Sequence, residues 1–141
     1  MVISEVKGDL FTSNDSLAHC VSMDFEMGKG IAKIFKDKFQ GVDELKKQNP
    51  SVGGISYLEK EEGKRFIFYL VTKEKYWQKP TLFSLSNSLL QMKKICLEKG
   101  IKSLSMPKIG CGLDKLNWDD VKKILEFIFK GSEINITIYS F

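Results

Sequence analysis

SLAHCVS, at residues 16–22, is the stretch that decides the fold class. The run is apolar with little alternation between apolar and polar positions, which is typical of a strand buried on both faces of a sheet. Such a sheet needs helices packed on both of its sides. The run RFIFYLVT, at residues 65–72, has the same buried character and follows a predicted strand at residues 53–60 through the turn EEGK. Together these runs indicate an α/β domain with a mixed, largely parallel sheet.

Strand and helix patterns alternate outward from these two runs. Strands are expected in six places, at residues 2–6, 16–22, 53–60, 65–72, 101–107 and 134–141. Helices are expected from residue 31 to a stop at Asn49 and Pro50, over residues 81–99 with Gly100 ending the helix, and over residues 118–130. The fold class expected is therefore α/β with a six-stranded sheet, and residues 1–141 form one domain.

Size and composition are those of an ordinary globular domain. The chain has 141 residues, of which 43% are hydrophobic and 28% charged. Its formal net charge of +4 is too small to indicate by itself a protein that binds nucleic acid. It has no apolar stretch long enough for a membrane helix, and its first ten residues lack the layout of a secretory signal. Three widely spaced cysteines and one histidine argue against structural zinc. We expect a cytoplasmic monomer with no metal and no cofactor.

Four loops follow expected strands and should meet at one edge of the sheet. They are GDL at residues 8–10, MGKG at 27–30, TKEK at 72–75 and KIGCGLD at 108–114. Glycine lets backbone amides approach a phosphate closely, so the two glycine loops together could cradle a diphosphate. Neither loop is a Walker motif or a GxGxxG fingerprint, and each taken alone is more often a simple turn.

Four polar side chains near this edge are candidates for binding or chemistry. Asp9 could accept a hydrogen bond from the exocyclic amine of adenine, although a turn aspartate bonded to its own backbone is the commoner case. His19 lies within a buried run and is expected to be a hydrogen-bonded core histidine. Lys73 ends an apolar strand, where burial can lower a lysine pKa enough for attack as a free amine; the alternative is a surface lysine. Asp114 could act beside it as acid or base, or cap the following turn.

The order of five motifs resembles the macrodomain family. They are VKGDLF, SLAHCVS, MGKGIA, FIFYLVTK and SMPKIGCGLD, and they extend over nearly the full length of the chain. The resemblance is nearest to the terminal ADP-ribose protein glycohydrolase type. It implies a three-layer α/β/α fold with an ADP-ribose cleft at the strand ends and removal of ADP-ribose from a modified acceptor.

The resemblance also implies residue roles. In it, Asp9 and Leu10 match the adenine-binding turn, and Lys73 and Asp114 match a catalytic pair in which the lysine attacks the anomeric carbon of the distal ribose and the aspartate helps to resolve the adduct. The remaining ADP-ribose contacts that it implies are Ser22, Met27, Gly28, Gly30, Ile31, Thr72, Pro107, Ile109, Gly110, Cys111, Gly112 and Leu113.

Departures from the family patterns leave the acceptor open. The asparagine and triple-glycine pattern of the commoner macrodomain hydrolases is missing, since the first loop reads MGKG and the strand before it ends in HCVS. Its absence shifts the mechanism away from substrate-assisted water attack. Met23, Phe25, Tyr76 and Trp77 add bulky groups that could reshape the acceptor side of the cleft. The acceptor expected first is a glutamate or aspartate ester in ADP-ribosylated protein. Alternatives are O-acetyl-ADP-ribose, ADP-ribosylated nucleobases in DNA, and a reader that binds ADP-ribose without turnover.

Overall fold

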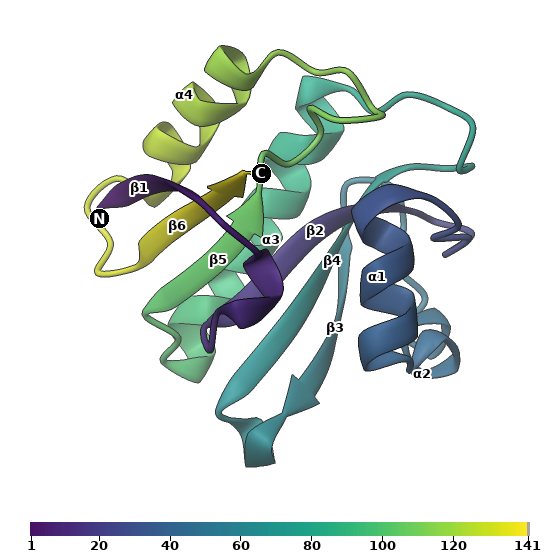
Figure 1. The fold of residues 1–141 in the computed structure, drawn as a ribbon, viewed down its shortest axis with the longest axis horizontal. Coiled ribbons are helices and arrows are strands. Elements are labelled where there is room, and N and C mark those ends of the chain that lie inside the picture. Colours follow the sequence, from purple (N-terminus) through teal and green to yellow (C-terminus); the bar gives the residue numbers. More distant parts are fainter. Residues whose placement is uncertain (141) are drawn as a thin grey trace.

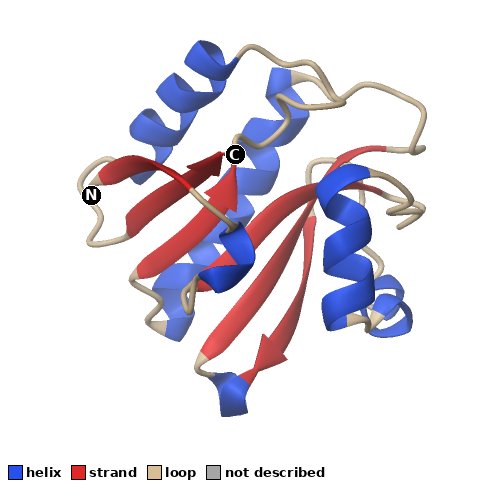
Figure 2. Ribbon diagram, viewed as in Figure 1, coloured by secondary structure: helices blue, strands red, loops and turns tan. Residues whose placement is uncertain are grey.

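The computed structural model describes residues 1–140 and shows one sheet between two layers of helices (Figure 1, Figure 2). The strands are β1 (Ile3–Lys7), β2 (Ser16–Ser22), β3 (Ile55–Lys60), β4 (Arg65–Lys73), β5 (Ser103–Pro107) and β6 (Asn135–Ser140). The α-helices are α1 (Gly30–Phe39), α2 (Val42–Lys47), α3 (Leu82–Lys99) and α4 (Trp118–Phe129), with short 3₁₀ turns at Leu10–Thr12 and Glu61–Gly63. Phe141, the end of the last expected strand, lies outside the described residues. In the part described, no helix combines the length and apolarity needed to cross a membrane.

The strands form one sheet in the order β1-β6-β5-β2-β4-β3. Every neighbouring pair is parallel except β3 and β4, which pair antiparallel through the tight connection after Lys60. The expectation of a six-stranded mixed sheet is confirmed. Because five of the six strands run the same way, their carboxyl ends share one edge, where the loops after them converge.

The β4 strand explains why its sequence is apolar without alternation. Successive side chains of a strand point to opposite faces, so a strand covered on both sides must be apolar at every position. Phe66, Phe68 and Leu70 point to one face and pack with α3 and α4 in the larger core. Ile67, Tyr69 and Val71 point to the other face and pack with α1 and α2. The expected helices on both faces are thus present.

The first helical region differs in detail from the expectation of one continuous pattern. It is divided into α1 and α2 at Gln40 and Gly41, which have φ of 53° and 76°. A Cβ atom on Gly41 would lie 2.9 Å from the Leu58 side chain of β3, so the backbone turns where it meets the sheet. This break places α2 beside β3 and leaves the amino end of α1 at the edge where the parallel strands end.

Candidate active site

A cavity of about 1020 Å³ lies at the carboxyl ends of the parallel strands. Its wall contains residues of all four loops that were expected to meet there, together with the end of β6. The sequence-predicted residues in the wall are Leu10, Ser22, Met27, Gly28, Gly30, Ile31, Lys73, Pro107, Ile109, Gly110, Cys111, Gly112, Leu113 and Asp114. Tyr139 and Ser140, and the charged residues Glu26, Lys79, Lys108 and Lys115, are among the wall residues that sequence reasoning missed. The available signal was that β6 runs parallel to its neighbours, so its end reaches the same edge.

Asp9 and Thr72 are predicted site residues that do not line the cavity. The Asp9 carboxylate accepts a hydrogen bond from the Phe11 amide at 2.9 Å and caps the 3₁₀ turn that follows. This is the turn role that the sequence left open. Met23 and Phe25 are also absent from the wall, and Phe25 is buried in the core beneath α1.

A bulge between β2 and β4 sets the position of Lys73. Val21 pairs with Val71, but the next residue, Ser22, pairs with Lys73, so Thr72 is an extra residue without a partner in the ladder. Thr72 is buried, whereas the residue after it lines the cavity. A bulge re-aims the side chains beyond it, and this one brings Lys73 beside Ser22.

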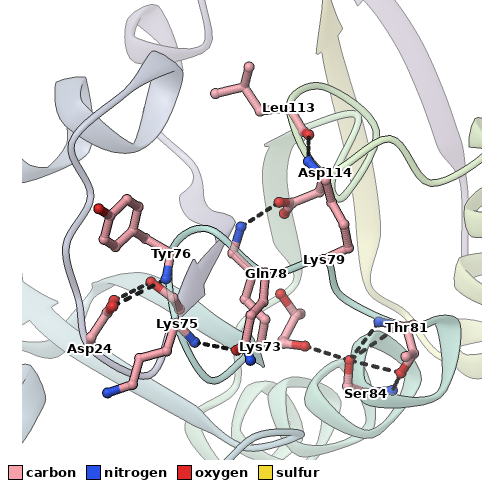
Figure 3. Close-up of polar contacts among 12 residues, drawn as sticks. Asp24, Lys73, Lys75, Tyr76, Gln78, Lys79, Thr81, Ser84, Leu113 and Asp114 are labelled. Atoms are coloured by element: carbon pink, nitrogen blue, oxygen red, sulfur yellow. Dashed lines mark hydrogen bonds and ion pairs between the residues drawn. The ribbon is translucent and has the colours of Figure 1, made fainter.

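Lys73 and Asp114 form an ion pair at this edge (Figure 3). The Lys73 Nζ atom lies 2.6 Å from Asp114 Oδ1, and the two side chains are only 13% and 15% exposed. The lysine ends β4 and the aspartate belongs to the loop after β5, so the fold joins residues that are 41 positions apart. At this distance the two groups are within hydrogen-bonding reach of each other, which is the geometry that proton transfer between an acid and a base requires.

The loop before α1 has the features of an anion site. Helix α1 begins at Gly30, with φ of 58°, and Lys29 before it makes no side-chain cap, so the first backbone amides of the helix keep their hydrogen-bonding capacity for a ligand. The side chains of Phe25 and Met27 are buried, and their backbones adopt the left-handed conformation, with φ of 52° and 48°. This conformation is costly for residues other than glycine. Such backbone strain is concentrated at binding sites.

The second glycine loop is held by close packing. Gly110 has φ of 72°, and a Cβ atom there would lie 2.8 Å from Leu116 Cδ1. The Leu116 amide donates to the Gly110 carbonyl at 2.7 Å, which closes the loop that carries Asp114. At the rim of the cavity, the position of a Cβ on Gly30 lies 3.6 Å from Leu113 Cδ1, which is van der Waals contact distance. The two glycine loops therefore meet at one side of the cavity that both of them line.

The charge of the cavity wall suits an anionic ligand. Five lysines line it against the two carboxylates of Glu26 and Asp114. The lysines are Lys29, Lys73, Lys79, Lys108 and Lys115. With the backbone amides of two glycine loops, this wall can receive a diphosphate.

Other nucleophiles and bases in the wall are poorly suited to chemistry. Burial raises the pKa of the Cys20 and Cys111 thiols, so both stay protonated at neutral pH. Burial also lowers the pKa of His19 to about 3. His19 is a core residue as expected, but the prediction that it is hydrogen-bonded is wrong. Neither ring nitrogen has a partner within residues 1–140, and the ring stacks on Phe35 at 3.7 Å.

Comparison with known proteins decides the family. The Macro domain family matches residues 18–125. The chain belongs to the macrodomain family. This macrodomain is 48% identical over 140 residues to the ADP-ribose glycohydrolase OARD1 of Homo sapiens, a match that covers 98% of the chain and 91% of the human protein. The sequence-based recognition is confirmed.

Solved structures agree on the fold of this macrodomain. The macrodomain of Mycobacterium tuberculosis DarG superposes with a TM-score of 0.87 at 24% identity, covering 98% of this chain and 97% of the other. Thermosipho africanus DarTG, solved in complex with ADP-ribose, superposes with a TM-score of 0.85 at 27% identity, covering 98% of this chain and 41% of the other. Within residues 1–140, no three His, Cys, Asp or Glu side chains gather as a metal site would require.

Proposed function

We propose that this macrodomain is an ADP-ribose glycohydrolase that cleaves the bond between the distal ribose of ADP-ribose and an acceptor. The ion pair between Lys73 and Asp114 carries the proposal, because it places a nucleophile and a proton acceptor together in the wall of an anion-binding cleft. The relative of 48% identity that bears this activity in its name supports it. Simple binding of ADP-ribose would need the glycine loops but not this pair.

The two ends of the cleft suggest the direction in which ADP-ribose lies. In this arrangement the diphosphate sits between the loop before α1 and the loop after β5, on amides near Gly30 and Gly112. The adenosine end lies toward Leu10 and Tyr139, in the wall formed by β1 and β6. The distal ribose then reaches Lys73, at the end of β4.

The proposed reaction balances without a redox partner. Asp114 takes a proton from Lys73, and the free amine attacks the anomeric carbon of the distal ribose. The bond from that carbon to the acceptor oxygen breaks, and the electron pair leaves with the acceptor as a carboxylate. The ribose ring opens to give a Schiff base with the lysine. Water adds to this carbon, the carbon–nitrogen bond breaks, and ADP-ribose and the free lysine are released.

Protein carboxylate esters are the first acceptor to test, with O-acetyl-ADP-ribose as a small ester. An ester leaves as a stabilised carboxylate, so departure of the acceptor needs no strong acid in the site. A nucleobase acceptor is the second candidate, and the aromatic residues beside Lys73 favour it. The third candidate, a reader, would bind ADP-ribose with no product formed.

Reductive trapping tests the enzyme proposal. Sodium borohydride added during turnover should fix ADP-ribose on the protein, and peptide mapping should find the adduct at Lys73. Lys73→Ala should lose turnover by about a thousandfold while it still binds ADP-ribose in a calorimeter. Lys94→Ala, on the exposed face of α3, is the matched control. Turnover by Lys73→Ala at the wild-type rate would refute the mechanism.

A further inference from the structure

Helix α3 carries a row of apolar side chains on the face that points away from the sheet. Phe83, Leu90 and Leu97 are 76%, 52% and 60% exposed, whereas the opposite side of the helix packs in the larger core. Seven residues make almost two turns of a helix, so the three side chains follow one line over about 21 Å. Single exposed apolar side chains are ordinary, but a contiguous row of them indicates a contact surface. We call these three residues the α3 stripe.

Phe127 of α4 widens this surface. α4 lies beside α3 on the same face of the sheet (Figure 1), and the Lys93 ammonium donates to the Ile128 carbonyl at 2.7 Å, which joins the carboxyl halves of the two helices. Lys122, on the far side of α4, pairs with Glu5 of β1 at 2.9 Å. Residues five apart on a helix point in widely different directions, so Phe127 points outward on the side of α3. Its side chain is 82% exposed.

The apolar area of this surface is close to that of a stable dimer interface. Phe83 and Phe127 are both about four-fifths exposed, so each contributes about 150 Å² of accessible surface. With the two leucines of the stripe, the apolar surface is roughly 450 Å² on each copy of the chain. A standard interface buries about 800 Å² on each partner, of which somewhat more than half is apolar. Two copies of this surface therefore supply the apolar contact that an ordinary dimer needs.

The spacing of the α3 stripe makes it complementary to a second copy of itself. Leu90 lies at the middle of α3, and Phe83 and Leu97 lie seven residues to either side of it. When two such helices pack antiparallel about a two-fold axis through Leu90, the phenylalanine of each copy meets Leu97 of the other. Seven residues is also the period at which two helices pack along a shared seam. An unrelated partner would not require this symmetry, whereas a homodimer does.

The residues around the α3 stripe permit the antiparallel contact. Asn87 and Gln91 beside it are uncharged. Lys94 is a charged neighbour of the stripe, but the antiparallel arrangement puts Asn87 of the other copy beside it and keeps the two copies of Lys94 about 12 Å apart along the helix axes. The same arrangement brings Phe127 beside the amino half of the other α3, where Phe83 lies. Two aromatic pairs can therefore form at the ends of the seam.

We infer that this macrodomain forms a two-fold symmetric homodimer through α3 and α4, with Leu90 at the axis. The inference differs from the monomer expected from the sequence. The α3 stripe and Phe127 are absent from the cavity wall, which lies at the amino end of α3. Antiparallel packing of the two α3 helices points the two clefts in opposite directions, so each copy keeps an open cleft. The inference is therefore independent of the proposed function.

Analytical ultracentrifugation of the full chain tests the dimer. As the concentration rises from about 1 to 100 µM, the mass should approach twice the 16.1 kDa of the chain. Leu90→Glu places two carboxylates at the axis and should weaken association about a hundredfold or more, with an unchanged far-UV circular dichroism spectrum. Ile34→Glu adds the same charge at a 45% exposed position of α1, on the other face of the sheet, and as the matched control should leave association unchanged.

A designed charge pair tests the antiparallel register. Phe83→Lys and Leu97→Glu should each weaken the dimer about tenfold. The double variant should recover most of this loss, because the introduced lysine of each copy meets the introduced glutamate of the other. The two positions lie about 21 Å apart within one chain, so they cannot pair internally. In a parallel dimer, like charges would meet and the double variant would associate most weakly.

The outcomes that would overturn the inference are distinct. A chain that keeps its monomer mass at about 100 µM would overturn it and leave the α3 stripe to a different protein. A dimer that Leu90→Glu does not weaken, or that Ile34→Glu weakens equally, would place the interface on another surface. A double variant that associates less well than both single variants would refute the two-fold antiparallel arrangement.

Discussion

Lowering the pH from 7 to 5 is expected to destabilise the protein by about 2 kcal/mol through one side chain, His19. It is the one histidine in the sequence, so no other imidazole titrates in this range. The side chain is 1% exposed, stacks on Phe35, and has no hydrogen-bond partner within the described residues. Burial holds its pKa at about 3, against 6.5 in an unfolded chain.

The sign follows from the two protonation states. In the folded protein the imidazole stays neutral down to about pH 3, whereas in the unfolded chain it takes up a proton below pH 6.5. Between these values the unfolded state binds more protons, so the free energy of unfolding falls as the pH falls. Stability from this group is fully present above pH 6.5. Each pH unit below that value removes about 1.4 kcal/mol, which gives about 2 kcal/mol at pH 5.

Urea unfolding at pH 7, 6 and 5, followed by far-UV circular dichroism, measures the effect. His19→Phe is the matched variant, because a phenyl ring can keep the stacking on Phe35 and cannot titrate. Its stability should change little over the same pH range. A flat wild-type profile, or an equal fall in both proteins, would refute the reasoning.

Three further predictions concern the loops around the cleft. Gly110→Ala should destabilise the protein by about 2 kcal/mol or more, because the new Cβ would clash with Leu116 and the backbone there is left-handed. Gly112→Ala is the control, because the space around its Cβ is open and its stability should stay close to that of the wild type. Equal unfolding midpoints for the two variants would contradict this prediction. Thr81→Ala removes the cap of α3 and should cost about 1 kcal/mol in urea unfolding, and no loss would show that the cap is dispensable. Asp24→Ala removes the acceptor of hydrogen bonds from the Tyr76 and Glu26 amides, so it should lower the free energy of unfolding by about 2 kcal/mol. Trypsin should then cleave faster after Lys75, and an unchanged cleavage rate would show that other contacts hold the loop after β4.

The architecture could be predicted from local sequence patterns, because each pattern indicates which side chains of an element are buried. The uninterrupted apolar run of β4 could only belong to a strand covered on both faces, and the spacing of Leu85, Leu89 and Met92 reports the buried side of α3. The break between α1 and α2 was not accessible in this way. It depends on the contact between Gly41 and Leu58, which belong to elements that meet only in the folded chain.

The site was predictable to the level of loops but not of individual contacts. Strand ends placed Lys73 and Asp114 at one edge, yet their ion pair depends on the bulge at Thr72, which no local pattern encodes. The same bulge explains why Thr72 turned out buried, away from the cavity wall. The environment of the His19 ring was also not predictable from the sequence, because the ring is covered by Phe35, which belongs to α1.

The pairing of the first strand with the last has a consequence for how the protein is made. Of the six described strands, β1 is synthesised before the others and its partner β6 after them, and the Gly8 amide donates to the Ser140 carbonyl at 2.8 Å. The side of the cleft formed by β1 and β6 therefore cannot close until β6 has been synthesised, since contacts between distant segments form late. A nascent chain stalled before residue 135 would have β2, β4 and Lys73 in place, but not the wall of the cleft that Tyr139 and Ser140 complete.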